Sequence, residues 1–212
     1  MTEFKLPPTF DSPTLVLVEG SDDEALVGAL VKHHGLPGFQ LLNMKGKDDW
    51  TNKIRAISAD SSFRANVLAL GLVRDADQDP AAAWQSCSGA IRTAGLVAGL
   101  RPGEFGTGRP RTCVVIIPGA DRKGAIEELC IDSFPPKAMT CVYSYFECLD
   151  GGQPSDRKSK AYVQAYLAGI IPLQRNLQVA ASAMKLDLGH HAFDDLRAFL
   201  KALNAASTSG AP

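Results

Sequence analysis

The sequence contains no apolar run long enough to cross a membrane and no apolar segment near its start. About 20 consecutive apolar residues are needed to span a bilayer, and no stretch of the chain approaches that length. Residues 1–13 are polar and contain prolines, which is not the pattern of a secretory signal peptide. We therefore expect a cytoplasmic protein with no membrane partner.

Cysteine is present in an odd number, and no two cysteines form a C-x-x-C pair. A disulfide framework uses an even number of cysteines, and zinc sites and redox motifs commonly use closely spaced pairs. Most of these cysteines instead fall within apolar runs, where cysteine packs as a small hydrophobic side chain. The sequence therefore predicts reduced, buried thiols at Cys87, Cys113, Cys130, Cys141 and Cys148.

Charge of one sign is not in excess, because 22 Lys and Arg residues stand against 23 Asp and Glu residues and the formal net charge is −1. A nearly neutral chain has no general attraction for nucleic acid. Any partner that carries phosphate must therefore be held locally, by a basic patch or through a metal ion. Arg109 and Arg111, in the glycine- and proline-rich segment 101–111, are candidates for contact with phosphate.

Several well-known motifs are missing. There is no G-x-x-x-x-G-K-[ST] phosphate loop, and segment 106–111 lacks the third glycine of the G-x-G-x-x-G pattern. The segment 75–79 begins like a calcium-binding EF-hand loop, but Pro80 stands where that loop requires glycine and Ser86 where it requires a bidentate glutamate. These absences exclude a P-loop, a dinucleotide-binding fingerprint and an EF-hand.

Strand and helix signals alternate through the first two thirds of the chain. Four continuous apolar runs indicate strands buried on both faces, at residues 14–18, 39–43, 67–73 and 112–117. Helical spacing and capping signals follow each run, at residues 21–34, 49–59, 80–97 and 124–131. This alternation predicts an α/β fold with a mostly parallel four-stranded sheet and helices on both faces.

The strand pattern is lost after residue 135. Residues 138–149 suit either a strand or a helix, and we favour the helix. Further amphipathic helices are expected at residues 158–169 and 193–203. We therefore divide the chain into an α/β core at residues 1–134, a helical extension packed on that core at residues 135–204, and a small, polar, disordered tail at residues 205–212.

Acidic residues gather where two of the apolar runs stop. One cluster follows residues 14–18 and the other follows residues 67–73, and they contain Glu19, Asp22, Asp23, Asp75, Asp77 and Asp79. Ligands bind open α/β sheets outside the carboxyl ends of the strands. Carboxylate oxygens are also the ligands that hard divalent cations prefer. The two clusters therefore predict a shared cation site suited to phosphate chemistry.

The individual carboxylates differ in how well a structural role explains them. Asp75 and Asp77 are two residues apart, so an extended backbone would send both side chains to the same side, where they can share a cation. Glu19 has no capping role. Asp79 precedes Pro80 and is a natural N-cap. Asp22 and Asp23 lie in a first helical turn, where the helix dipole stabilises carboxylates, and Ser21 with Glu24 forms a capping-box pattern.

Taken together, Val18-Glu19-Gly20, Asp75-Ala76-Asp77 and the four strand–helix units resemble the TOPRIM domain. That domain is shared by topoisomerases, primases, small ribosomal-RNA maturation nucleases and the overcoming-lysogenisation-defect nucleases. The spacing Glu19-x-x-x-Asp23 is similar to the nuclease branch. The segments beginning at Gly124, Lys158 and His191 are similar to a group of uncharacterised small stand-alone TOPRIM-related bacterial proteins.

The resemblance implies a Rossmann-like TOPRIM fold and a cation, Mg²⁺ or Mn²⁺. It implies that Glu19, Asp75 and Asp77 hold this cation and that Asp23 and Glu127 serve as second-site ligands. A lysine at Lys160 or Lys158 would then face the scissile phosphate.

Our leading hypothesis is a magnesium-dependent phosphodiesterase, most simply a nuclease. In this hypothesis Glu19, Asp75 and Asp77 hold the metal, and Lys160 neutralises charge on the phosphate. Glu19 could instead act as a general base. One alternative is a non-catalytic module that binds a metal-nucleotide or an operon-encoded protein partner. Another is a phosphotransferase with Asp75 as nucleophile, as in haloacid-dehalogenase-like phosphatases.

Overall fold

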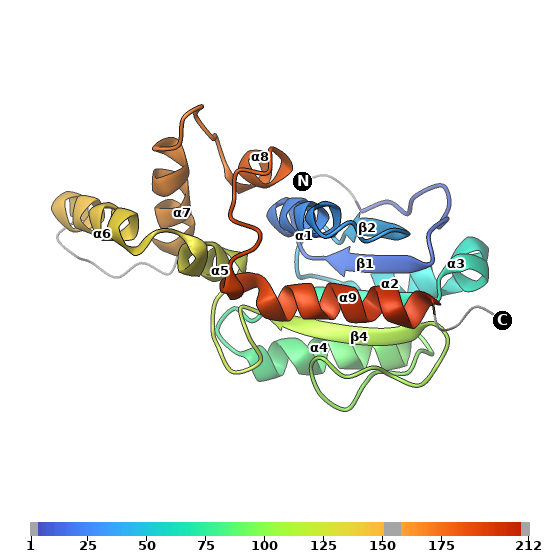
Figure 1. Ribbon diagram of the computed structural model, residues 1–212. Helices are drawn as coiled ribbons and strands as arrows, with labels where there is room; N and C mark the ends of the chain where they lie inside the picture. The colour runs from blue at the N-terminus through green and yellow to red at the C-terminus, as the bar shows by residue number, and fades with distance from the viewer. Residues whose placement is uncertain (1–3, 151–157, 209–212) are drawn as a thin grey trace.

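The computed structural model describes residues 4–150 and 158–208, and its centre is a sheet of four parallel strands (Figure 1). The strands lie in the order β2-β1-β3-β4. Their bounds are Thr14–Val18 for β1, Phe39–Asn43 for β2, Ala69–Asp75 for β3 and Arg111–Ile117 for β4. The predicted α/β class, the four parallel strands and the surrounding helices are confirmed.

Both faces of the sheet are apolar, because each central strand sends alternate side chains into two different clusters. Val16 and Val18 of β1 belong to one cluster, and Leu15 and Leu17 belong to the other. The register sets the strand ends level, since Val18 pairs with both Asn43 and Val73. The chain therefore leaves three neighbouring strands at the same edge of the sheet.

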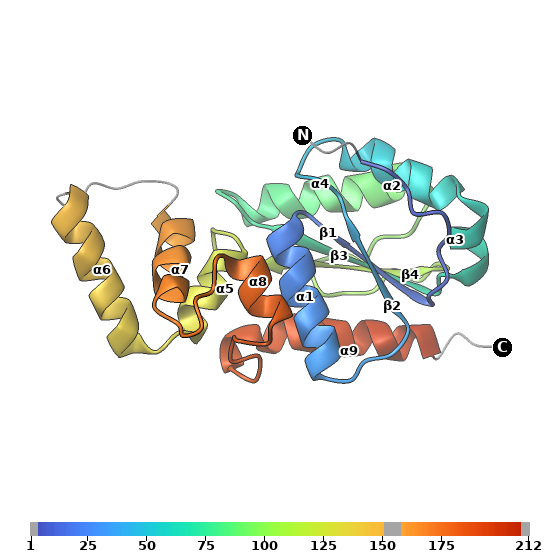
Figure 2. The same cartoon turned by 90° about the horizontal axis from the view of Figure 1, so that it is seen from above.

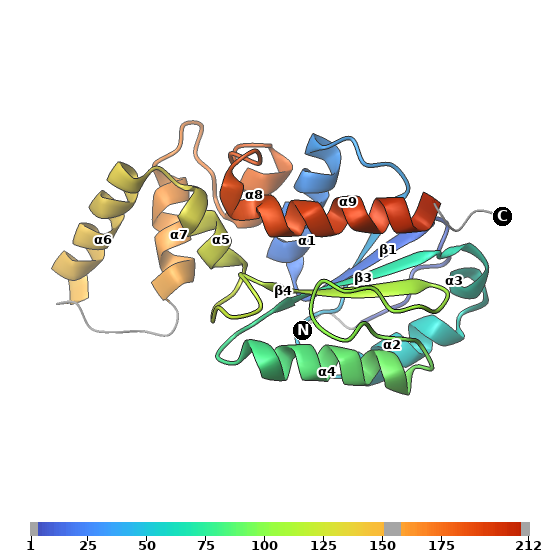
Figure 3. The same ribbon diagram turned by 60° about the horizontal axis from the view of Figure 1, so that its bottom comes forward.

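Helices cover the two faces as separate layers (Figure 3). The helices α1 (Ser21–His33) and α9 (Asp194–Thr208) lie on one face, where α9 contacts β1, β3 and β4. The other face is covered by α2 (Trp50–Ala59) and α4 (Pro80–Thr93), with the short helix α3 (Ser61–Asn66) beyond them. The sequence pattern did not predict α3, which has six residues.

A glycine allows α9 to approach the sheet closely. A Cβ atom at Gly71 of β3 would lie 2.4 Å from Leu203 Cδ1 and 2.8 Å from Phe199 Cζ. The helix also continues to Thr208, so the first residues of the predicted tail are helical. Their order has a physical reason, because Ala206 and Ser207 are buried against the sheet. Residues 209–212 of that tail lie outside the described residues.

One further helix, α5 (Ile126–Ser133), lies where a helix was predicted at residues 124–131 of the core. The segment predicted as a helical extension contains α6 (Pro136–Asp150), α7 (Lys158–Ala168), α8 (Leu177–Ser182) and a 3₁₀ turn, η1 (His191–Phe193), before α9. Figure 2 shows α6 and α7 extending away from the sheet, whereas α8 packs on α1. The helix favoured over a strand at residues 138–149 is present as α6. The short helix α8 was not predicted.

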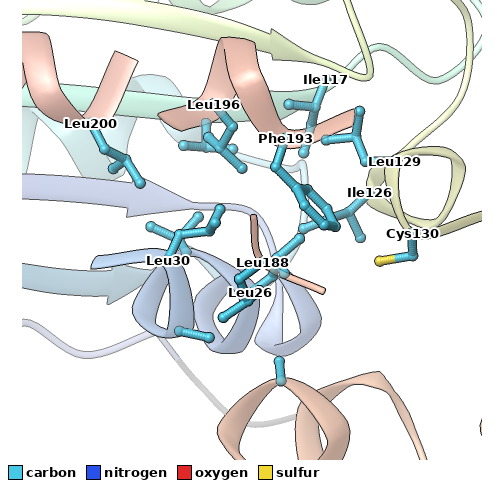
Figure 4. Close-up of a cluster of buried hydrophobic side chains, with 14 of the residues drawn as sticks. Leu26, Leu30, Ile117, Ile126, Leu129, Cys130, Leu188, Phe193, Leu196 and Leu200 are labelled. Carbon is cyan, nitrogen blue, oxygen red and sulfur yellow. The ribbon is translucent and has the colours of Figure 1, made fainter. Parts of the chain in front are cut away.

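The core cluster that contains Leu26 of α1 also fixes the start of α5 (Figure 4). Leu26 and Leu30 gather with Phe193 and Leu196 and with apolar side chains from α5. Ile126, the first residue of α5, is 2% exposed in this cluster. Apolar packing therefore holds the first turn of α5 beside the carboxyl ends of the strands.

The cysteines are only partly as expected. All five are free, and Cys87, Cys113 and Cys130 are buried. Cys141 and Cys148, both on α6, are exposed. The prediction of buried thiols was wrong for these two. Within residues 4–150 and 158–208, no helix has the length and apolar character needed to cross a membrane.

Candidate functional site

The ends of β1 and β3 bring most of the predicted acidic residues to one pocket. Its volume is about 220 Å³. Glu19 directly follows β1, Asp75 is the last residue of β3, and Glu127 comes from the first turn of α5. The pocket is lined by Glu19, Gly20, Ser21, Asp22, Asp23, Gly46, Asp75, Ile126, Glu127 and Lys160. We call it the carboxylate pocket.

Asp75 lies at the edge of the sheet in this pocket and is partly buried. Its Oδ1 atom is buried and has no hydrogen-bond partner among the described residues. Burial raises the pKa of Asp75 to about 9, and the neighbouring carboxylates of Asp23 and Glu19 act in the same direction. A buried, unpaired carboxylate is costly to ionise. The Oδ1 atom of Asp75, which lacks a hydrogen-bond partner among the described residues, is therefore suited to a ligand that carries positive charge.

Asp23 has both a structural role and an unsatisfied oxygen. Its Oδ2 atom accepts a hydrogen bond of 2.8 Å from the backbone N–H of Gly20, which caps α1. Its Oδ1 atom is buried without a partner in the described part of the chain. Burial raises the pKa of Asp23 to about 7, and the charges of Glu19 and Glu127 contribute to this rise.

The capping box of α1 therefore differs from the predicted one. Gly20, not Ser21, is the N-cap, because the helix begins one residue earlier than the Ser21 and Glu24 pattern required. Glu24 instead accepts a hydrogen bond of 3.0 Å from the side chain of Asn43 in β2. The predicted N-cap at Asp79 is confirmed, since its carboxylate accepts a 3.0 Å bond from Ala82 N.

Glu19 is paired with Arg74, a residue that the sequence did not predict to be part of the site. Arg74 Nη1 donates to Glu19 Oε2, and Arg74 is only 7% exposed. Burial raises the pKa of Glu19, whereas the charge of Arg74 lowers it. The signal for Arg74 was a basic residue beside Asp75 at the end of an apolar run. It was missed because the predicted strand stopped at residue 73, whereas β3 continues to Asp75.

Asp77 does not follow the extended geometry expected of it. The strand β3 ends at Asp75, and Asp77 has a φ of 49°. The alternation of side chains along an extended strand therefore does not apply to Asp75 and Asp77. Asp77 Oδ2 lies 3.1 Å from the ammonium group of Lys47, which was not predicted as a site residue. Asp77 lines a second pocket of about 450 Å³ that shares Glu127 and Lys160 with the carboxylate pocket.

Lys160 reaches the carboxylate pocket from α7. Its Nζ atom lies 3.4 Å from Asp22 Oδ2 and 3.8 Å from Glu127 Oε1. Burial raises the pKa of Glu127, and Lys160 lowers it. Next to Glu127, Glu128 accepts hydrogen bonds from Ala125 N and from Ser159 Oγ, at 2.7 Å and 2.5 Å. Glu128 thus joins the starts of α5 and α7, a role that no sequence pattern indicated.

The predicted phosphate contacts Arg109 and Arg111 lie elsewhere. Arg111 begins β4, and the strand runs about 20 Å before it reaches the edge that carries the carboxylates. Its guanidinium carbon lies 5.0 Å from the centre of the Phe105 ring. Arg109 precedes it in the connecting loop. The structure therefore does not bring these arginines to the pocket, whereas Lys158 begins α7, two residues before Lys160.

A family model described as "Protein of unknown function (DUF3226)" matches residues 13–205. The chain belongs to this family. No curated protein sequence matches the chain. Two solved structures of the C-terminal region of the Xanthomonas campestris pv. campestris OLD protein are similar to this DUF3226 chain. One, phased with platinum, has a TM-score of 0.51 and 12% identity over 93% of this chain and 95% of that one.

The second structure of that region, phased with iodine, has a TM-score of 0.52 and 13% identity. It covers 94% of the DUF3226 chain and 99% of the matched chain. At this level of identity the likeness shows a shared fold. The match extends over nearly the whole length of both chains, so it includes the helical extension as well as the sheet.

The donor chemistry of the carboxylate pocket fits a hard divalent cation. Every acidic ligand candidate offers carboxylate oxygens, which Mg²⁺ and Mn²⁺ accept, and no cysteine or histidine lines the pocket. Two of these oxygens, on Asp23 and Asp75, are buried and have no hydrogen-bond partner among the described residues. Over residues 4–150 and 158–208, no three acidic, histidine or cysteine side chains lie close enough together to hold a metal ion in the present arrangement.

Proposed function

We propose that this DUF3226 chain is a magnesium- or manganese-dependent phosphodiesterase of the TOPRIM type that hydrolyses nucleic acid. The observation that carries the proposal is the buried, unpaired carboxylate oxygen of Asp75, which lies among other acids at the carboxyl edge of a parallel sheet. A divalent cation is the natural counter-charge for such a group. The likeness to OLD C-terminal regions supports the TOPRIM assignment at the level of fold.

The side chains divide into two sets of ligands around the pocket. Glu19 and Asp75 line the carboxylate pocket at the end of the sheet, and Asp77 lines the second pocket beside it, so these three would hold the first cation. Asp23 and Glu127 line the α1 and α5 side and would hold a second. A bound divalent cation supplies Lewis acidity and lowers the pKa of a bound water molecule.

Lys160 would act on the phosphate itself. Its side chain is 64% exposed, so it can turn from Asp22 and Glu127 toward a phosphate at the mouth of the pocket. A positive charge placed there stabilises the charge that develops during phosphodiester cleavage. Lys158, at the first position of α7, would contact the neighbouring backbone of the nucleic acid.

A second candidate function is a non-catalytic module that binds a metal-nucleotide or a protein partner. The ion pairs favour it, because three of the five proposed ligands already have a positive partner: Glu19 with Arg74, Asp77 with Lys47, and Glu127 with Lys160. A phosphotransferase with Asp75 as nucleophile is less consistent with the fold. In the haloacid-dehalogenase-like pattern the nucleophile follows the first strand, whereas Asp75 ends β3.

The direct test is the cleavage of end-labelled RNA and DNA in Mg²⁺ or Mn²⁺. We expect the wild type to cleave one of them, and the double variant Asp75→Ala, Asp77→Ala to lose activity. Lys160→Met should lose on the order of 100-fold or more in rate. Lys32→Met, an exposed lysine at the end of α1, is the matched control.

Equal cleavage by the wild type and the double aspartate variant would exclude the proposed mechanism. A wild type that binds Mg²⁺ or a nucleotide in calorimetry but cleaves neither nucleic acid would instead support the binding module. In that case, retention of a protein partner in a pull-down should survive the substitution at Lys160.

A further inference from the structure

Glu19 belongs to a closed ring of contacts. Gly46 N donates to the backbone carbonyl of Glu19 at 2.8 Å, and Trp50 Nε1 donates to the carbonyl of Gly46 at 2.9 Å. The guanidinium carbon of Arg74 lies 5.3 Å from the centre of the Trp50 ring, and Arg74 Nη1 donates back to Glu19 Oε2. The backbone and the carboxylate of Glu19 are both fixed by this ring.

The burial of Arg74 requires an explanation, because arginine is seldom buried so completely unless an ion pair or hydrogen bonds offset the cost of its desolvation. Arg74 lies on the face of β3 that also carries Leu70 and Leu72, and its guanidinium reaches the end of the neighbouring strand. There it holds one carboxylate oxygen of Glu19. None of the described residues donates a hydrogen bond to the other oxygen, Oε1, which is left for a ligand in the carboxylate pocket that Glu19 lines.

We propose that Arg74 is a positioning residue that holds Glu19 in its cation-binding orientation, and that Trp50 holds Arg74 in turn. This inference rests on the proposed function, because it assumes that the carboxylate pocket takes a divalent cation. Carboxylates that bind metals are commonly oriented by hydrogen bonds from a second layer of residues. Loss of such a partner typically weakens metal binding or activity 10- to 100-fold.

Charge and position make opposite predictions for Arg74. If the arginine acted only through its charge, its removal would strengthen cation binding, because a repulsive positive charge would disappear from beside the pocket. If it acts by positioning Glu19, its removal weakens cation binding. The direction of the change in affinity therefore decides between the two roles.

The test is calorimetric titration of the full, metal-free chain with Mn²⁺ alone. We expect Arg74→Met to bind Mn²⁺ about 10- to 100-fold more weakly than the wild type. Arg74→Lys keeps the charge but not the planar fork of donors, so its affinity should fall between the two. Arg111→Met is the matched control for metal affinity, because it removes an arginine that also lies over an aromatic ring, but at the opposite edge of the sheet.

Trp50→Phe provides a second test of the positioning role in case Arg74→Met does not fold. Arg74→Met leaves Glu19 partly buried without its counter-charge, so each variant is first checked by circular dichroism and thermal melting. Trp50→Phe keeps an aromatic ring beneath the guanidinium but removes the N–H that bonds to Gly46. It should fold, and it should bind Mn²⁺ more weakly than the wild type.

The outcomes separate this inference from the proposed function. Equal or tighter Mn²⁺ binding by Arg74→Met overturns the positioning role. If Arg74→Met does not fold, the positioning role is overturned when both Arg74→Lys and Trp50→Phe bind Mn²⁺ as tightly as the wild type. Weaker binding by the variants, together with a wild type that cleaves no nucleic acid, keeps the positioning role and removes the hydrolase. A wild type that binds no Mn²⁺ overturns both.

Discussion

The backbones of Asp77 and Gly124 exchange two hydrogen bonds, each 2.8 Å from nitrogen to oxygen. This contact joins the turn after β3 to the loop that leads into α5. It brings Glu127 and Glu128, from the first turn of α5, beside the acids that follow β1 and β3. The position of the α5 residues in the candidate site therefore depends on a short antiparallel bridge between two loops.

Gly124 is expected to be intolerant of a side chain. Its φ is 122°, and a Cβ atom would lie 2.6 Å from Glu128 Cδ. Gly124→Ala should lower the free energy of unfolding by about 1–3 kcal/mol, as measured by urea denaturation. Gly95→Ala is the matched control, because Gly95 also has a positive φ but no atom within 4 Å of the added Cβ. A loss at Gly124 no larger than at Gly95 would contradict the crowding argument.

A glycine pair tests the close approach of α9 to the sheet. Gly71→Ala places a methyl group against Leu203 and Phe199, so we expect destabilisation of about 1–3 kcal/mol from overpacking. Gly89→Ala, inside α4 with nothing within 4 Å of the new Cβ, should stabilise the protein by about 0.5–1 kcal/mol. Thermal melting of the two variants should shift in opposite directions. Shifts in the same direction would show that α9 can move to accept the methyl group.

The sequence predicted the sheet and the gathering of acids at its carboxyl edge because both depend on local patterns. Continuous apolar runs indicate buried strands, and the acids directly after them must lie at the carboxyl edge. Arg74 was missed because the predicted strand stopped before it, and Lys47 was missed because its contact with Asp77 depends on which strand lies beside which. The same holds for Gly71, whose neighbour Leu203 is more than a hundred residues away in the chain. The predicted extended conformation of Asp77 was wrong because the turn that contains Asp77 is set by its bridge to Gly124.

The stability of the metal-free protein should fall as pH rises, and Asp75 should be one cause. Its folded pKa, about 9, is above the ordinary value of 3.8, so the folded state binds this proton more tightly than the unfolded state. The stabilisation from the bound proton is therefore lost as pH increases from about 4 to about 9, with a slope of at most about 1.4 kcal/mol per pH unit.

Asp75→Asn removes this proton-binding group. In urea denaturation with a chelator present, the variant should gain stability over the wild type as pH rises from about 5 to about 8. A constant difference between Asp75→Asn and the wild type across this range would contradict the raised pKa of Asp75.

The most direct test of the cation site is the thermal response to divalent metal. At about 100 times its dissociation constant, a ligand specific for the folded state adds about 2.7 kcal/mol. Mg²⁺ or Mn²⁺ should therefore raise the Tm of the wild type above a sodium control of equal ionic strength. The double variant Asp75→Asn, Asp77→Asn should melt above the wild type in chelator, because the cost of burying the Asp75 carboxyl group among other acids is removed, and should not respond to metal. A double variant that is less stable in chelator and still responds to metal would contradict the account, because these aspartates would not form the cation site.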